Sequence, residues 1–421
     1  MDCQKYLDAL HREIKPALGC TEPIAVALAV AKATETLGCR PEKIALWVST
    51  NILKNAMGVG IPGTGMVGLE IASALSCIAG RSAYGLEVLS AATPEDCEAA
   101  RVYAATGCIQ VHTKDTEKKL YIEAHTYANG HEAVCVIEDA HTNVTHVQLD
   151  DQVLEHQETQ TLHPGASMGD DLDVVGIYAF ATTVDLNCVR FLNDAIAMND
   201  TIAQEGLSKN YGMRVGRVLQ QGRSMEEMSL SEYVCAYTAA AADARMAGST
   251  LPVMSTTGSG NQGISASLPV VAAARKLGSD EDTMLRAETL SQLITIHIKS
   301  HIGKLSPLCG CAIAASIGSS AGIVYLLGGG INEILSAIQN MIADVSGLIC
   351  DGAKSGCALK IASALASAVQ CAQLAMAGVT ATRLDGIVAE DVEVSIRNLA
   401  NLGIVGMNQT DRVILDMMLA K

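Results

Sequence analysis

LSPLCGCAIAASIGSSAGIVYLLGG (residues 305–329) and SGLICDGAKSGCALK (residues 346–360) are the stretches around which the rest of the chain can be understood. Against a background of Gly, Ala and Ser they carry four cysteines, Cys309, Cys311, Cys350 and Cys357. Thiolates are the natural ligands of iron–sulfur clusters and of zinc. The two cysteines of CDGAKSGC and one distant cysteine could together provide three ligands for a metal centre. The alternative is that these are small, inert core residues, and spacing alone slightly favours it.

The region around these stretches has the apolar period of α-helices almost throughout. Few β-branched alternations interrupt the pattern, and Gly-rich turns separate its segments. The predicted helices span 173–182, 185–206, 225–247, 265–277, 280–301, 312–327, 331–345, 358–378 and 388–401. We therefore expect residues 172–421 to form a mostly α-helical domain.

The first 165 residues mix helical and strand patterns. Predicted helices span 5–18, 22–38, 69–80 and 94–105, and predicted strands span 43–50, 107–112, 120–126, 133–137 and 145–149. Turn signals between the strands favour an antiparallel sheet. The polar segment 152–171 is predicted to be a linker. The expected fold class is α+β, with an N-terminal α+β domain over 1–165 and a mostly helical domain over 172–421.

Composition excludes several classes of function. The 29 Lys and Arg against 45 Asp and Glu give a formal charge of −16, which is unsuited to binding nucleic acid or an anionic membrane. No apolar signal segment is seen at the N-terminus. The apolar run 361–379 is interpreted as a buried or interface helix rather than a membrane span. Fourteen irregularly spaced cysteines indicate a reducing, cytoplasmic location. Ala-rich helices suggest a homodimer.

Two segments outside the cysteine stretch could bind or transform a ligand. In GCTEP (19–23), Cys20 is expected at a helix N-terminus, where the dipole lowers the pKa of a thiol. A buried, inert cysteine is the alternative. The Gly-rich segment 51–68 follows a strand and could bind a substrate carboxylate. Its candidate contacts are Asn51, Lys54, Asn55 and Thr64, and a plain structural turn is about as consistent with the sequence.

A second Gly-rich turn, TTGSGNQG (256–263), offers Asn261 and Gln262 at a predicted helix N-terminus. Neither Gly turn is interpreted as a dinucleotide site, because neither lies in a clean βαβ unit. His297 and His301 stand four residues apart on one helix face, a spacing that suits zinc. The neighbouring Lys299 and Lys304 argue against a metal there.

The combination of GNQG (260–263), the CGCAIAASIGSSAG helix start (309–322) and CDGAKSGC (350–357) resembles the α-subunit of oxygen-sensitive iron–sulfur L-serine dehydratases. With GCTEP and NILKNAM…IPGTG (51–65) in the same chain, it more closely resembles the L-cysteine desulfidase family. The resemblance covers nearly the whole chain. The C-terminal cysteine tail of the serine dehydratases is absent, since this chain ends LDMMLAK.

The resemblance implies a 4Fe–4S cluster held by three cysteines. Cys350 and Cys357 match two of the family ligands, and the third is Cys309, with Cys311 as the alternative. Cys20 matches the family's catalytic base. Lys54, Asn55 and Asn261 are our candidates for binding the substrate carboxylate.

The implied reaction is β-elimination from a small amino acid, L-cysteine, which yields sulfide, pyruvate and ammonia. The chain would then be an oxygen-sensitive lyase of cysteine catabolism. An L-serine dehydratase is the first alternative, since the two substrates differ by one atom. A non-catalytic iron–sulfur or zinc redox sensor is the second, although no effector or DNA-binding module is visible in the sequence.

Overall fold

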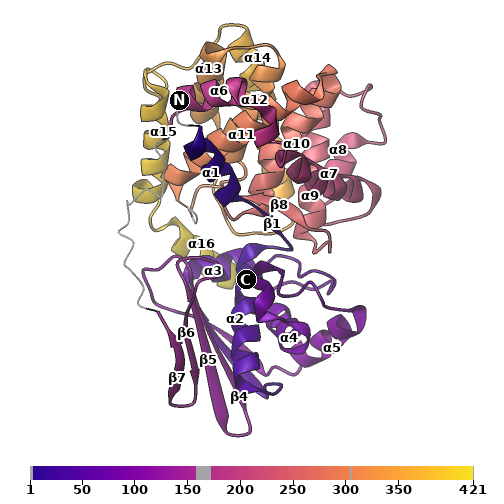
Figure 1. The fold of residues 1–421 in the computed structure, drawn as a ribbon, viewed down its shortest axis with the longest axis vertical. Coiled ribbons are helices and arrows are strands. Elements are labelled where there is room, and N and C mark those ends of the chain that lie inside the picture. The colour runs from indigo at the N-terminus through magenta and orange to yellow at the C-terminus, as the bar shows by residue number, and fades with distance from the viewer. Residues whose placement is uncertain (1–2, 158–171, 304–305, 421) are drawn as a thin grey trace.

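The computed structural model describes residues 3–157, 172–303 and 306–420, which form two units (Figure 1). The smaller unit is a six-stranded sheet covered by helices, and the larger unit is a bundle of helices. The expected α+β class, with a mostly helical second half, is confirmed. More than one segment of the chain joins the two units. The first helix packs against the larger unit, and the last helix packs against the smaller unit.

The sheet of the smaller unit has the order β3-β2-β4-β5-β6-β7. Its strands are β2 (Lys43–Val48), β3 (Ile109–Thr113), β4 (Tyr121–Ala128), β5 (His131–Glu138), β6 (Val144–Leu149) and β7 (Gln152–His156). All neighbouring pairs are antiparallel except β2 and β3, which are parallel. The helices that connect β2 to β3 supply the long crossover that a parallel pair requires. The antiparallel prediction is therefore wrong for this one pair.

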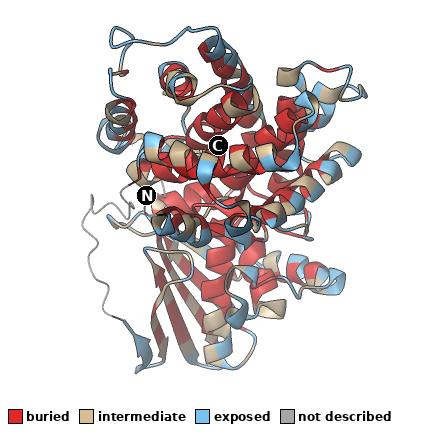
Figure 2. Cartoon of the chain, turned by 45° about the horizontal axis from the view of Figure 1, so that its top comes forward, coloured by how far each residue is buried: buried red, intermediate tan, exposed pale blue. Residues whose placement is uncertain are grey.

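Helices cover one face of this sheet. They are α2 (Thr21–Leu37), α3 (Thr50–Ala56), α4 (Leu69–Ala79) and α5 (Pro94–Ala104), with a 3₁₀ turn at Ser82–Glu87. β4 alternates strictly between buried and half-buried residues, so one sheet face lies against α2 (Figure 2). The helix α2 is buried on nearly all sides, since α4 and the sheet both pack against it.

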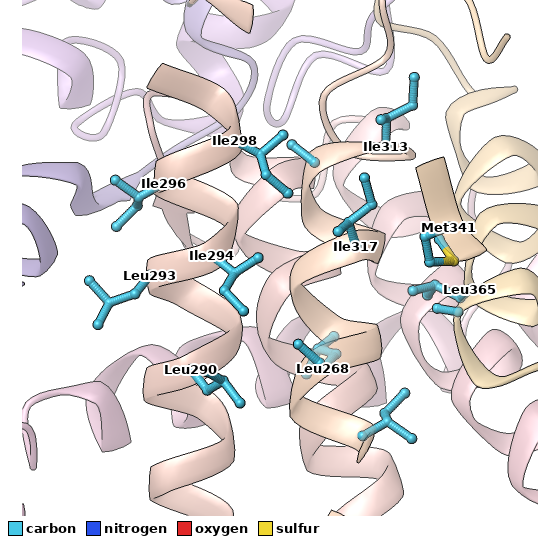
Figure 3. Packing of buried hydrophobic residues seen from close by; sticks show 14 of the residues in the cluster. Leu268, Leu290, Leu293, Ile294, Ile296, Ile298, Ile313, Ile317, Met341 and Leu365 are labelled. Carbon is cyan, nitrogen blue, oxygen red and sulfur yellow. The ribbon is translucent and has the colours of Figure 1, made fainter. Parts of the chain in front are cut away.

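The larger unit is built from helices with small side chains. They are α6 (Val174–Thr183), α7 (Leu192–Ser208), α8 (Val215–Gln220), α9 (Leu230–Met246), α10 (Gly260–Leu277), α11 (Glu281–Ile302), α12 (Ala314–Leu326), α13 (Ile331–Val345), α14 (Cys357–Met376) and α15 (Val392–Asn401). Branched apolar side chains of α10, α11 and α12 interlock at the centre, among them Leu268, Ile294 and Ile317 (Figure 3). A short 3₁₀ turn (Leu186–Cys188) and a π turn (Leu402–Gly406) complete the unit.

The two termini cross between the units. The N-terminal helix α1 (Gln4–Glu13) belongs to the apolar core of the larger unit. It is followed by β1 (Ile14–Ala17), which pairs antiparallel with β8 (Val253–Thr256). The C-terminal helix α16 (Thr410–Leu419) instead packs on α3 of the smaller unit. The predicted domains 1–165 and 172–421 therefore do not match the packing at either end of the chain.

The linker predicted over 152–171 is wrong in its first part. Residues 152–156 form β7, the edge strand of the sheet, and this strand is exposed along its whole length. Residues 158–171, which contain the predicted domain boundary, lie outside the described residues. The prediction that 5–18 is a continuous helix is also wrong, because the chain becomes extended at Ile14.

One helix of the described residues, α14, is long and apolar enough to cross a membrane by length and composition. Half of the apolar segment of this helix is buried within the protein, where α9, α12 and α13 pack against it. This packing agrees with our interpretation of residues 361–379 as a buried helix.

The close contact between α7 and α9 predicts the effect of adding one methyl group. A Cβ at Gly206 would lie 2.0 Å from the carbonyl oxygen of Ala240. We expect Gly206→Ala to destabilise the protein by about 1–3 kcal/mol, because the two helices must separate. Thermal unfolding followed by circular dichroism measures the change.

The matched control is Gly347→Ala, since a Cβ there would meet no atom within 4 Å and the residue is not left-handed. We expect the control to stay within about 0.5 kcal/mol of the wild type. Equal losses in both variants would contradict the close-packing explanation.

Candidate active site and metal centre

Backbone pairing brings the two cysteine-bearing segments together. Leu308 and Ile349 form an antiparallel bridge. On either side of it, the Cys309 amide donates to the carbonyl of Leu348 at 2.9 Å, and the Cys350 amide donates to the carbonyl of Pro307 at 2.6 Å. These bonds place Cys309 and Cys350 side by side, although 41 positions separate them in the sequence.

Four cysteines line a single cavity of about 100 Å³ at the junction of the two units. They are Cys309, Cys311, Cys350 and Cys357, and Cys357 is the first residue of α14. The cavity is also lined by Cys20, Glu22, Asn55, Arg245, Asn261, Gln262 and Lys299. The structure therefore brings together the predicted cysteines with Asn55, Asn261 and Gln262, whereas Lys54, Asn51 and Thr64 do not line this cavity.

The Sγ atoms of Cys309 and Cys311 are 3.4 Å apart. Two thiolates bound to one tetrahedral ion at about 2.3 Å lie at about 3.8 Å from each other, which is close to this separation. This separation therefore suits both thiols equally, and the choice between Cys309 and Cys311 as the first ligand rests on their burial and thiol pKa. The pKa of the Cys309 thiol falls below its ordinary value, chiefly because Cys311 donates a hydrogen bond to it.

The residue between these two cysteines, Gly310, is closely approached by side chains of α10 and α11. A Cβ at Gly310 would lie 2.4 Å from the Oε1 atom of Gln262 and 3.2 Å from the Nζ atom of Lys299. The CGC segment thus passes directly over the first turn of α10 and the last turns of α11. Burial lowers the pKa of Lys299 to about 8, although the neighbouring pocket cysteines act in the opposite direction.

Cys20 is the residue that precedes α2, as predicted, but its thiol is not activated by that position. It donates a hydrogen bond to the Oε2 atom of Glu22 at 3.2 Å. Burial, followed by the charge of Glu22, raises the pKa of the Cys20 thiol far above its ordinary value. The expectation that the helix dipole lowers this pKa is wrong.

Glu22 is the acid that sequence reasoning passed over, although it lies within the GCTEP segment. Its Oε1 atom accepts from Asn55 at 3.1 Å, and its Oε2 atom accepts from Thr21 at 3.1 Å as well as from Cys20. Burial raises the pKa of Glu22, but the charge of His141 and the donated hydrogen bonds outweigh burial and hold the pKa below the ordinary value. The pocket therefore contains a buried, hydrogen-bonded carboxylate next to a thiol.

The first turn of α10 forms the opposite wall. Ser259 caps this helix by accepting from the Gln262 amide, so Asn261 lies in a helical first turn, as predicted. The guanidinium of Arg245 donates to Asn261 Oδ1 at 3.0 Å and to the carbonyl of Gly19 at 2.8 Å. Its buried Nε has no partner among the described residues. Arg245 is a second functional candidate that sequence reasoning missed, because it ends an Ala-rich helix with no motif around it.

Lys54 lies behind the wall of the pocket and does not line it. Residues 50–56 form α3 instead of the predicted open turn, and the Lys54 side chain is 1% exposed. Its ammonium pairs with Asp411 of α16 at 2.5 Å and donates to the carbonyl of Cys350 at 3.0 Å. Asn51 donates to the same carboxylate at 2.7 Å. Lys54 therefore supports the cysteine segment from behind, in place of the predicted contact with substrate.

The donor set fits a metal–sulfur centre. Four thiols converge in one small cavity, and the buried ammonium of Lys299 lies beside them. A buried cation is costly unless an anionic group compensates it. A cluster bound by thiolates is such a group. The pocket also contains Arg245 and the α10 N-terminus, which can bind a carboxylate.

The buried Lys54–Asp411 pair gives a stability prediction. Replacing Asp411 with Asn leaves the Lys54 ammonium buried without its counter-charge. We expect a loss of about 3–5 kcal/mol in the free energy of unfolding, measured by chemical denaturation.

The control for this prediction is Glu98→Gln, which removes the exposed carboxylate that pairs with Arg101 at 2.6 Å. An exposed pair contributes about 0–1 kcal/mol, so this variant should unfold almost like the wild type. If both variants lost the same small amount, the pair with Lys54 would not be a significant support of the site.

Comparison with known proteins places the chain among relatives of matching length. The family model described as "Serine dehydratase alpha chain" matches residues 83–416. A UPF0597 protein of Phocaeicola vulgatus is 47% identical over 99% of this chain and 98% of its own length. UPF0597 proteins of Bacteroides thetaiotaomicron and Clostridium perfringens are 46% and 43% identical with the same coverage. The chain therefore belongs to the serine dehydratase alpha chain family, and the predicted relation to the serine dehydratases is confirmed.

Proposed function

We propose that this member of the serine dehydratase alpha chain family is a cytoplasmic lyase that eliminates the β-substituent of L-cysteine. The products would be sulfide and aminoacrylate, which decays to pyruvate and ammonia. The observation that carries the proposal is the single pocket that combines four cysteines with a buried thiol–carboxylate pair and two buried cations. All fourteen cysteines are free thiols in the structure, in keeping with a reducing compartment.

Cys350, Cys357 and one of Cys309 and Cys311 are the residues that would hold a 4Fe–4S cluster. When bound, the cluster supplies an open, Lewis-acidic iron. Cys309 is the more buried of the two candidates for the first ligand and has the lower thiol pKa, which favours it over Cys311.

The substrate carboxylate is assigned to the wall formed by α10. Arg245 lines the pocket and is rigidly held by Asn261 and by the carbonyl of Gly19. The amides of the first helical turn favour an anion at the same place. Binding the carboxylate there offsets the negative charge that develops when the α-proton leaves. Of our original candidates, Asn261 and Asn55 keep a place in the pocket, and Lys54 acts only through the segment it supports.

Proton abstraction is assigned to Cys20 and Glu22 together. At rest the thiol proton points from Cys20 Sγ to Glu22 Oε2. Because the pKa of Cys20 is raised and that of Glu22 is lowered, transfer of this proton to Glu22 is uphill. The Cys20 thiolate formed in this way is a strong base that can take the proton from the substrate Cα. The negative charge thereby moves from one buried group to its neighbour, and Asn55 remains a donor to Glu22 throughout.

Departure of the β-substituent is assigned to the side of the pocket near Lys299. Loss of the α-proton and cleavage of the Cβ–S bond release the sulfur as a hydrosulfide anion. The Lys299 ammonium lies among the pocket cysteines, and its pKa of about 8 lets it stabilise or protonate a leaving anion near neutral pH. L-serine is the second candidate substrate, because the family description names serine dehydratase and hydroxide would leave by the same route.

The decisive measurement is the release of sulfide and pyruvate by protein reconstituted and assayed without oxygen. We expect L-cysteine to give both products in equal amounts, and Cys350→Ala to lose the activity and the bound iron. Glu22→Gln should retain iron but lose about 10²–10⁴-fold in kcat, because it cannot accept the proton of Cys20.

The matched control is Cys371→Ala, which removes a buried cysteine that does not line the pocket. It should retain both iron and activity. Pyruvate from L-serine alone would assign the chain to the dehydratases. A colourless, inactive protein with zinc at the four cysteines would contradict the proposal and favour a structural or sensing role.

A further inference from the structure

A second group of metal-ligating side chains lies outside the cysteine pocket. His297 and His301 of α11 and Glu393 of α15 each offer a ligand atom, and these three atoms lie within 4.8 Å of one another. His297 Nε2 and Glu393 Oε2 are already 2.8 Å apart. The two imidazole rings meet edge to face, with their centroids 5.0 Å apart. The sequence showed the two histidines, but Glu393 comes from a helix about ninety positions further along.

In the sequence, the neighbouring Lys299 and Lys304 argue against a metal at His297 and His301. The structure removes this objection for Lys299. Lys299 lines the cysteine pocket, whereas residues 297 and 301 lie on the other side of α11, because successive residues are turned by about 100°. Lys304 lies outside the described residues. The cation that does face His301 is Arg397, one turn beyond Glu393, and its side chain is exposed to solvent.

The three side chains are buried or partly buried, and one of them is held in place by a further hydrogen bond. The His297 side chain is 3% exposed and the Glu393 side chain is 19% exposed, so the group is anchored inside and open towards solvent on one side. The second carboxylate oxygen of Glu393 accepts from the amide of Val174 at 2.8 Å, at the start of α6. A ligand carboxylate held in this way by an outer hydrogen bond is the usual condition of protein metal sites.

We propose that His297, His301 and Glu393 bind a divalent metal ion of the zinc type, in a site separate from the cysteine pocket. Two imidazoles and a carboxylate, with a fourth position left to water, form a donor set that zinc adopts in proteins. The ion would replace the proton shared by His297 and Glu393. It would thereby fasten α15 and the start of α6 to α11, the helix whose opposite side carries Lys299 into the cysteine pocket.

The test is zinc binding by equilibrium dialysis without oxygen, with metal content measured on the full chain. Wild-type protein should bind one zinc that His301→Ala and Glu393→Gln bind at least about 10-fold more weakly. Glu393→Gln keeps an oxygen to accept from Val174, so it is the variant that preserves the fold. X-ray absorption at the zinc edge should show nitrogen and oxygen neighbours at about 2.0–2.1 Å for this ion, without sulfur at about 2.3 Å.

The matched control is His146→Ala. His146 and His156 form an exposed pair on the sheet, with Nδ1 atoms 3.4 Å apart, and represent the adventitious alternative. All variants keep the four pocket cysteines, so the comparison is valid whether or not a cluster forms there. Zinc binding that is unchanged in both site variants, that is lost only in His146→Ala, or that shows only sulfur neighbours would overturn the proposal. So would a wild-type protein that binds no zinc.

Discussion

The buried ammonium of Lys54 is the interaction on which the arrangement of the site depends. It belongs to the smaller unit, its counter-ion Asp411 comes from the last helix of the chain, and its third partner is the carbonyl of Cys350. Gly352, two residues after Cys350, packs directly against the backbone of Lys54. A Cβ at Gly352 would lie 2.2 Å from the Lys54 carbonyl oxygen, and its φ of +92° is one that glycine adopts readily. One side chain thus fixes the position of three segments far apart in sequence.

The exchange of termini explains why the pocket can form at the junction of the two units. The segment before Cys20 is paired with β8, which leads into the α10 turn that carries Asn261. The opposite end of the chain returns through Asp411 to α3, which carries Asn55. Each wall of the cavity is therefore attached to both units. An interface between units that is cross-linked in this way leaves less freedom for relative motion than a single linker would.

Local sequence patterns predicted most of the helices and strands. The features that they did not predict depend on contacts between residues far apart in the sequence. The helical period identified α13 with its observed ends, and the apolar alternation identified β4 and β5. In contrast, β1 has four residues, and its partner lies about 240 positions away, so no local signal marks it. The prediction of Lys54 as a substrate contact failed for a similar reason. A Gly-rich neighbourhood suggested an exposed turn, whereas tertiary contacts with Asp411 stabilise a short buried helix.

The state of Cys20 follows from a comparison of magnitudes that sequence alone does not permit. A helix N-terminus stabilises a thiolate by about 0.3–1 kcal/mol, and by about 2 kcal/mol in favourable sites. Full burial can shift a pKa by about 3–5 units, and each unit corresponds to about 1.4 kcal/mol. Burial therefore outweighs the dipole, and the neighbouring charge of Glu22 acts in the same direction as burial. A thiol in this position can act as a base only if its proton has somewhere to go. Glu22, held as a carboxylate by donors on both oxygens, is the one acceptor with a hydrogen bond to the Cys20 thiol among the described residues.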